Sequence, residues 1–376
     1  MSALFSPIQF GTLTLANRIV IPPMCMYSAA DGCATDWHLM HYGQLAQSGA
    51  GLLIFEATAV EARGRISAYD MGLWNEAQVE ALKPVLAHIR RFSPIPVGIQ
   101  LAHAGRKASS ARPWEGGGAL PAGHPQAWPT LSASAQGFMP TDPTPASATL
   151  DDIAQIRQAF VDAAVRSHRL GFDVIELHAA HGYLLHQFLS PLSNLRDDAY
   201  GGSLDKRMRL TLEVFDATRD ALPGGFPLGV RISATDWVEG GWEIEQSKML
   251  AQALAARGCA FLHVSSAALH PAQQIPIGPG YQVPLAHALR DSLQGAMPVI
   301  AVGLITESQQ AEAVLQTGQA DAIGVARAML YNPRWPWEAA RQLGAQVSGA
   351  PQYLRCEPHG AKGLLKPSPS SNSPRS

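Results

Sequence analysis

Eight short runs of apolar residues, rich in Val, Ile and Leu, recur along the chain between longer amphipathic segments. They occupy residues 17–23, 50–58, 95–103, 172–180, 227–233, 259–267, 298–305 and 321–327. Continuous apolar strands that alternate with helices are typical of a parallel sheet whose two faces are both covered. Eight such units without a ninth predict an α/β fold of the closed (β/α)8 type, a TIM barrel, rather than an open sheet.

Three segments depart from this alternation. Residues 8–15 read IQFGTLTL and alternate around Gly11, which predicts an N-terminal β-hairpin at the bottom of the barrel. Residues 104–148, rich in Gly, Pro, Ser and Ala, form a long loop insertion after the third strand, and loops of this length are usually functional. Residues 357–376 end in a polar, Pro- and Ser-rich stretch and are predicted to be a disordered tail. We therefore expect a single domain over residues 1–356.

Two helix starts are marked by capping residues. Thr149 is followed by acidic residues and a periodic apolar stripe, which predicts an N-cap with favourable charge at the helix dipole. Thr306 and Gln309 resemble a capping box, with Gly318 at the end of the same helix. One helix is therefore expected after residue 149 and another after residue 306.

The composition narrows the class of ligand. With 47% hydrophobic and 15% charged residues among 376, the chain can bury a large core. A formal net charge of −2 and a pI near 6.7 provide no basic field for nucleic acid or an anionic membrane, so we expect a small-molecule partner.

No segment approaches the roughly 20 apolar residues of a membrane span, and the start lacks the features of a signal peptide, which predicts a cytoplasmic protein. The four cysteines, Cys25, Cys33, Cys259 and Cys356, form no CxxC pair, so neither a disulfide framework nor a zinc or iron–sulfur site is expected.

Polar residues gather at the predicted carboxyl ends of the strands, where (β/α)8 barrels place their active sites. The residues at the ends of separate strands are Gln100, His103, His178, His181, Arg231 and Arg327. We expect them to face one mouth. Arg231 stands on an otherwise apolar strand, where a buried guanidinium needs an anionic or electron-rich partner, and the sequence offers no carboxylate beside it. Gly303 and Arg327 match the phosphate-binding site of phosphate-binding barrels. The alternative is that Gly303 forms a tight turn and that Arg327 forms a surface ion pair.

The segment ELHAAHGYLLHQFL contains three histidines, His178, His181 and His186. The first two converge only if the strand ends between them, which Gly182 favours, and both could then bind one ligand oxygen beside Tyr183 as an acid. A zinc site would need a third ligand, and neither an HExxH motif nor acidic residues at the other strand ends supply one. Histidines satisfied within the core are the remaining alternative, and His186 is expected to be a packing or surface residue.

Five segments are specific in their order and spacing. They read NRIVIPPMCMYS, EATAVEARGRIS, GIQLAHAGRKA, IELHAAHGYLLHQFLSPLSNLRDDAYGGS and ARAMLYNPRWPW. Together they resemble the Old Yellow Enzyme family of flavin-dependent ene-reductases, in the bacterial branch that carries an active-site cysteine and includes the xenobiotic reductases. The resemblance extends from about residue 4 to about residue 356.

This resemblance implies a tightly held FMN at the barrel mouth. Pro23, Met24 and Cys25 would lie along the flavin, Ala57 and Gln100 would contact its ring, Arg231 would lie near N1, and Gly303, Ala326 and Arg327 would hold the phosphate. Arg231 would stabilise the negative charge of reduced flavin. Cys25 resembles a tuning residue beside the ring rather than a nucleophile, with a small buried hydrophobe as the alternative. Many relatives have Gly where this chain has Ala326.

The resemblance also implies catalytic roles. NADPH or NADH would reduce FMN, and His178 and His181 would donate hydrogen bonds to the carbonyl or nitro oxygen of an activated alkene while hydride reaches its β-carbon from flavin N5. Tyr183 matches the proton donor to the α-carbon, and Tyr27 would line the substrate side. Val302 stands where some xenobiotic reductases have a large aromatic residue. The smaller valine side chain would make the substrate pocket of this chain wider.

Near the end, PQYLR resembles the segment that in this branch carries an arginine into an adjacent subunit's active site. That residue is Arg355 here, which implies a homodimer or homotetramer. The expected function is therefore NAD(P)H-dependent reduction of α,β-unsaturated carbonyl or nitro compounds, without a metal. The alternatives are a metal-dependent barrel hydrolase or aldolase that uses the histidine cluster, and a non-catalytic flavin-binding protein.

Overall fold

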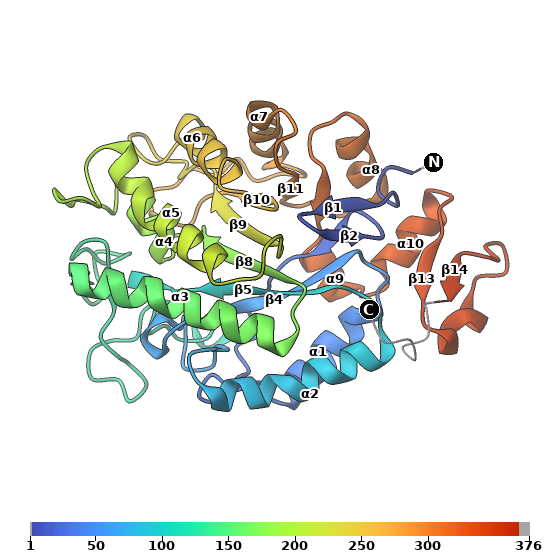
Figure 1. Ribbon diagram of the computed structural model, residues 1–376, viewed down its shortest axis with the longest axis horizontal. Coiled ribbons are helices and arrows are strands. Elements are labelled where there is room, and N and C mark those ends of the chain that lie inside the picture. Colours follow the sequence, from blue (N-terminus) through green and yellow to red (C-terminus); the bar gives the residue numbers. More distant parts are fainter. Residues whose placement is uncertain (1, 368–376) are drawn as a thin grey trace.

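The computed structural model describes residues 2–367, in which eight parallel strands close into one barrel (Figure 1). Around the axis these strands are β3 (Ile19–Ile21), β4 (Leu52–Ala59), β5 (Val97–Ala102), β8 (Val174–Ala179), β9 (Leu228–Ser233), β10 (Leu262–Ser265), β11 (Val299–Val302) and β12 (Ala322–Gly324). Each overlaps one of the eight apolar runs. The predicted (β/α)8 barrel is confirmed.

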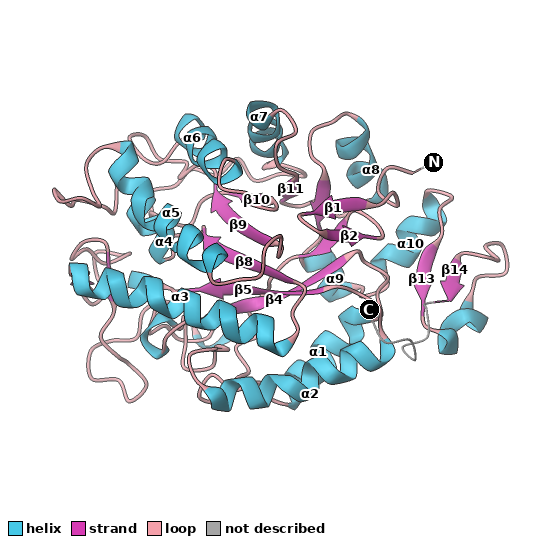
Figure 2. Cartoon of the chain, in the orientation of Figure 1, coloured by secondary structure: helices cyan, strands magenta, loops and turns pink. Residues whose placement is uncertain are grey.

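The helices surround this barrel, because parallel neighbours must be joined by crossover connections (Figure 2). They are α1 (Asp36–Ala46), α2 (Glu76–Phe92), α3 (Leu150–Leu170), α4 (Leu184–Leu189), α5 (Leu204–Asp220), α6 (Ile244–Ala255), α7 (Val283–Leu293), α8 (Ser308–Gln316), α9 (Arg327–Tyr331) and α10 (Trp335–Gln342). Their apolar faces and the outer faces of the strands form the main core.

One capping prediction is confirmed and the other is wrong. Thr149 caps α3, and its Oγ accepts the N–H of Asp152 at 3.1 Å. For α8 the N-cap is Glu307, without a side-chain cap, and Thr306 lies one residue further out. The glutamine that reaches back to the Thr306 N–H is Gln310, so the proposed pairing was displaced by one position.

The predicted hairpin closes the amino end of the barrel. β1 (Ile8–Phe10) pairs antiparallel with β2 (Leu13–Leu15). Phe10 stacks on Phe261 with 4.8 Å between the ring centroids, in a buried cluster with Val174 at the start of β8. Burial of these rings removes a large apolar area from water and leaves the opposite end of the barrel for ligands.

The insertion over residues 104–148 has a defined path. Within it, β6 (Leu131–Ser132) pairs in parallel with β7 (Ala146–Ser147). The buried guanidinium of Arg106 donates to the Leu269 carbonyl at 2.8 Å and to two carbonyls of the insertion at 3.2 and 3.3 Å. These bonds fasten the insertion to the loop after β10.

The boundary predicted at residue 356 is corrected, because regular structure continues beyond it. β14 (Leu365–Pro367) pairs in parallel with β13 (Val347–Gly349). Leu364 and Leu365 are both buried against Val347, and this burial offsets part of the entropy lost on ordering. Residues 368–376 of the predicted tail lie outside the described residues.

Candidate active site

The turn between β8 and α4 brings two histidines and a tyrosine together. β8 ends at Ala179, and His181 adopts a left-handed φ of 56°, so the His181 ring turns back toward His178. His181 Nδ1 lies 3.3 Å from His178 Nε2, and the Tyr183 ring packs edge-on against the His178 ring with 4.8 Å between centroids. The convergence that was expected if the strand ended between the histidines is present.

The electrostatic surroundings keep these groups uncharged. Burial, followed by the nearby charge of Arg231, lowers the pKa of both His178 and His181 well below the ordinary histidine value. Burial also raises the pKa of Tyr183 well above its ordinary value. His178 Nδ1 accepts the Ala180 N–H at 3.2 Å, which places the His178 proton on Nε2, the nitrogen that faces His181.

Arg231 projects from β9 into the same region and is only 7% exposed. Within residues 2–367 no hydrogen bond or ion pair reaches this guanidinium, and its Nε is buried without a partner. Burial lowers its pKa, but a guanidinium remains charged at any physiological pH. A buried cation without a hydrogen-bond or ion-pair partner among these residues, at the barrel mouth, fits a ligand that carries or develops negative charge.

A buried carboxylate lies close to Arg231, which corrects the expectation that the region offers none. Glu176 precedes His178 by two residues on β8, and its charge raises the pKa of Arg231 against the larger effect of burial. Glu176 Oε1 accepts Gln100 Nε2 at 2.7 Å, and Oε2 lies 2.8 Å from His263 Nδ1. Because Glu176 is already held by Gln100 and His263, it does not form an ion pair with Arg231.

The loop after β3, with Pro23, Met24 and Cys25, is partly exposed at the same end of the barrel. A register shift in β4 beside Ala57 turns the fully buried Glu56 outward, where its Oε2 accepts the backbone N–H of Met26 at 2.9 Å. This carboxylate was not predicted from the sequence, although a charged residue within an apolar strand was an available signal. Burial raises the pKa of Cys25 well above the ordinary thiol value, so Cys25 is a thiol and not a reactive thiolate.

A glycine follows β11 and an exposed arginine follows β12. Gly303 has a φ of 122°, and a Cβ at this position would lie 2.6 Å from Gln282 Nε2, so the chain needs glycine here. Ala326 is the N-cap of α9, and the next residue, Arg327, is exposed. No ion pair joins Arg327 to a carboxylate of the described chain, which removes the surface ion pair as an explanation.

Two of the expected residues do not join the cluster. His103 is buried but fully engaged, because its Nε2 lies 2.7 Å from Glu61 and its Nδ1 accepts the Gly105 N–H. Arg355 is exposed on a short 3-10 segment (Pro351–Cys356) outside the barrel. Tyr27 does border the site, and its ring meets that of Trp114 edge-on at 5.9 Å.

Neither a cluster of metal-ligating side chains nor a membrane-spanning helix occurs in residues 2–367. No three His, Cys, Asp or Glu side chains of that range are placed to hold a metal ion, so the histidine pair lacks the third protein ligand of a catalytic zinc site. None of the helices in the same range is both long and apolar enough to cross a bilayer.

Comparison with known proteins identifies the family. The model of the NADH:flavin oxidoreductase / NADH oxidase family matches residues 3–346. The chain is 44% identical over 364 residues to an NADH:flavin oxidoreductase of Gibberella zeae, covering 93% of this chain and 87% of that protein. It is 43% identical to the NADPH dehydrogenase of Geobacillus thermodenitrificans, covering 94% and 98% of the two chains. The structure of morphinone reductase in complex with tetrahydroNAD is similar with a TM-score of 0.75 and 26% identity, covering 100% of this chain and 98% of that one.

The described residues fit FMN as the cofactor. The unpartnered Arg231 guanidinium suits the electron-rich ring, and the close backbone approach at Gly303 beside the free Arg327 suits the phosphate. FMN is the cofactor and NAD(P)H the reductant. The chain therefore belongs to the NADH:flavin oxidoreductase / NADH oxidase family, the Old Yellow Enzyme-like flavoproteins, and is an NAD(P)H-dependent flavin oxidoreductase.

Proposed function

We propose that this enzyme is an ene-reductase for α,β-unsaturated carbonyl or nitro compounds, in the cysteine-containing branch that includes the xenobiotic reductases. The observation that carries the proposal is the cluster of neutral His178, His181 and Tyr183 beside the unpaired cation of Arg231. Neutral imidazoles and a phenol are hydrogen-bond and proton donors, which is what reduction of an activated alkene requires of the protein.

In this proposal the two histidines bind the substrate oxygen. His178 carries its proton on Nε2, and that N–H donates to the carbonyl or nitro oxygen. His181 is the second donor in the tautomer with its proton on Nδ1, the nitrogen that faces His178, while its Nε2 accepts the hydroxyl of Ser265 at 2.7 Å. These hydrogen bonds draw electron density from the double bond and leave the β-carbon electron-poor. Tyr27, which borders the same space, forms a wall of the substrate site.

Tyr183 supplies the proton. Its phenol is a weak acid that burial makes weaker still, so it transfers a proton only to a strongly basic carbon. The α-carbon becomes such a base once the β-carbon has received hydride. The packing of the Tyr183 ring against His178 supports this role, because the proposed acid then lies beside the residue proposed to hold the substrate oxygen.

FMN, when bound, would supply the hydride after its reduction by NADPH or NADH. The residues proposed to hold it are Pro23, Met24, Cys25, Ala57, Gln100, Arg231, Gly303, Ala326 and Arg327. Cys25, present as a thiol, would adjust the electronic surroundings of the ring rather than attack a substrate. Gln100, fixed by Glu176, would present its amide to the ring at a constant angle.

A homodimer or homotetramer is part of the same proposal, with Arg355 reaching the active site of a neighbour. The support is its position, since it is exposed and makes no ion pair within residues 2–367. A large exposed apolar side chain, Met40 at 64%, is also consistent with burial between subunits.

An anaerobic absorption spectrum tests the function. We expect an oxidised-flavin spectrum that bleaches with NADPH and returns with cyclohexenone. A yellow protein that bleaches but does not reoxidise with the enone would point to a flavin-binding protein without ene-reductase activity. Colourless protein that takes up no FMN would remove the cofactor assignment and favour a metal-dependent reaction of the histidines.

A further inference from the structure

The turn that carries His181 and Tyr183 has an unfavourable backbone conformation. His181 and Gly182 both have left-handed φ values, 56° and 71°. For a residue with a side chain this conformation is strained, and it persists only where the surroundings hold it. A Cβ at Gly182 would lie 2.2 Å from the Ala268 carbonyl oxygen, so the neighbouring loop leaves no room for movement in that direction.

Side chains, and not a backbone ladder, hold this turn. The four backbone polar groups of His181 and Gly182 each bind a different side chain. The His181 N–H donates to Ser233 Oγ at 2.9 Å, and its carbonyl accepts Lys107 Nζ at 2.9 Å. The Gly182 N–H donates to His186 Nδ1 at 2.9 Å, and its carbonyl accepts Gln187 Nε2 at 2.6 Å.

The bond from Gly182 to His186 depends on where a proton lies. His186 Nδ1 accepts the Gly182 N–H only while the ring proton is on Nε2. His186 Nε2 lies 2.9 Å from Asp236 Oδ1, and both side chains are completely buried. Asp236 comes from the loop after β9, and the 2.9 Å contact of its carboxylate oxygen with Nε2 favours the tautomer that carries the proton on that nitrogen.

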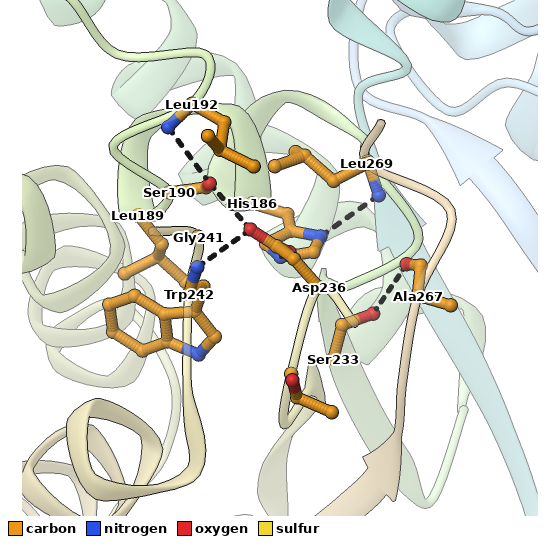
Figure 3. A network of polar contacts seen from close by, with 12 residues as sticks. His186, Leu189, Ser190, Leu192, Ser233, Asp236, Gly241, Trp242, Ala267 and Leu269 are labelled. Atoms are coloured by element: carbon orange, nitrogen blue, oxygen red, sulfur yellow. Dashed lines mark hydrogen bonds and ion pairs between the residues drawn. The ribbon is translucent and has the colours of Figure 1, made fainter. Parts of the chain in front are cut away.

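Two hydrogen bonds to the second carboxylate oxygen, Oδ2, hold the Asp236 side chain in place (Figure 3). Ser190 Oγ donates to Asp236 Oδ2 at 2.6 Å, and the backbone N–H of Trp242 donates to the same oxygen at 2.7 Å. With both donors on Oδ2, Oδ1 remains directed at His186. The expectation that His186 is a packing or surface residue therefore describes its burial but not its hydrogen bonds.

We propose that Asp236 and His186 are positioning residues of the active site: Asp236 fixes the tautomer of His186, and His186 holds the Gly182 N–H and thereby the placement of His181 and Tyr183. Neither residue touches the substrate. The inference rests on the proposed function, because it matters for catalysis only if His181 and Tyr183 act on the substrate.

Asp236→Asn is the informative variant, because it keeps the shape and reverses one hydrogen bond. The new amide oxygen can still accept from Ser190 and Trp242, while its NH2 donates to His186 Nε2. That forces the His186 proton onto Nδ1, where it faces the Gly182 N–H as donor against donor. We expect enone turnover of the FMN-loaded enzyme to fall on the order of a hundredfold, the loss typical of slightly misplaced reacting groups.

Nitrogen-15 NMR of histidine-labelled protein reads the tautomer directly, and His186→Asn identifies the His186 signals by their disappearance. We expect Nε2–H in the unmodified enzyme, Nδ1–H in Asp236→Asn, and faster hydrogen exchange of the Gly182 amide in that variant. Nδ1–H in the unmodified enzyme, or a changed tautomer with undiminished turnover, would overturn the inference. Asp220→Asn, exposed at the end of α5, is the matched control and should change none of these readouts.

A combined variant separates positioning from general damage. In His186→Asn the amide oxygen can accept the Gly182 N–H whatever residue 236 is, so adding Asp236→Asn should cost little further turnover. A full additional loss in the double variant would contradict the proposal. Absence of enone turnover in the unmodified enzyme would refute the proposed function alone, because the tautomer and the Gly182 exchange rate still decide the positioning role.

Discussion

His178 and Tyr183 pack against each other with 4.8 Å between ring centroids, and burial moves their pKa values in opposite directions. The same physical effect explains both shifts, since a buried site disfavours imidazolium and phenolate alike. Both side chains therefore keep their neutral, proton-donating forms over a wide pH range. At the scale of single residues, this environment, and not the residue types alone, suits the cluster to the proposed activation of an alkene.

Tyr183→Phe should separate the two halves of the reaction. The change removes the proposed acid and leaves the ring against His178, so alkene reduction should slow by about a hundredfold or more while flavin reduction by NADPH changes little. Stopped-flow measurement of each half-reaction checks this. Tyr331→Phe, at a position 94% exposed, is the control. An unchanged oxidative half-reaction in Tyr183→Phe would remove Tyr183 as the acid.

Lys107 should leave a pH signature in stability. Burial, and then the charge of Arg106, lowers the Lys107 pKa to about 8, whereas the pKa of a lysine in the unfolded chain is about 10.4. The unfolded chain therefore holds one more proton between these values, and stability gains from this group as pH rises through that window. Urea unfolding below and above the window should show the unmodified protein gaining stability relative to Lys107→Met. A pH-independent difference between the two proteins would contradict the shifted pKa.

At the scale of elements, the insertion after β5 lies beside the proposed substrate side of the site. Trp114 meets Tyr27 edge-on at 5.9 Å, and the Phe138 ring lies 4.8 Å from Lys107 Nζ. The same ammonium lies 5.3 Å from the Tyr183 ring centroid. The insertion thus borders the proposed substrate space beside both tyrosines, which supports the expectation that a loop of this length is functional.

Trp114→Ala should change substrate size preference rather than chemistry. Trp114 is 63% exposed, so its removal should cost little stability and should open the space beside Tyr27. We expect kcat/KM for bulky enones to rise several-fold relative to cyclohexenone, the effect of about 1 kcal/mol. Met139→Ala, an exposed apolar residue of the same insertion, serves as the control. An unchanged ratio between large and small substrates would remove Trp114 from the substrate wall.

At the scale of the whole molecule, the described chain contains nearly the complete set of proposed site residues at one barrel mouth. Arg355 is the exception, since it lies on the outside near Tyr353, which packs against Trp337 of α10. In the proposed oligomer, Arg355 would contribute to the active site of a neighbouring subunit. A symmetric interface would place the equivalent arginine of that neighbour at the first subunit's site.

Arg355→Ala tests this arrangement. If the arginine crosses an interface, KM for the enone should rise several-fold while the amount of bound FMN stays constant. Arg341→Ala changes an exposed arginine on α10; it is the matched control and should have no effect. Analytical ultracentrifugation gives the subunit number, and a fully active monomer would rule out the contribution of a neighbour.

Much of the architecture was readable from the chain itself. Every barrel strand overlaps a predicted apolar run, and the hairpin around Gly11 was signalled by alternation. The structure added Glu56 and Glu176, two buried carboxylates within apolar strands, and the pairing of β14 beyond the predicted domain end. These were harder to infer because each depends on a partner that is distant in sequence.

What the sequence by itself determined is the barrel and the strand ends at which polar residues gather. The reason is that burial on both faces imposes a continuous apolar run on each strand, and this signal is local. Only the tertiary structure decided that His178 and His181 are neutral, that Arg231 has no hydrogen-bond or ion-pair partner among residues 2–367, and that Asp236 meets His186 across 50 positions of sequence. Desolvation and hydrogen-bond direction depend on every element packed around a group, and no pattern along the chain records them.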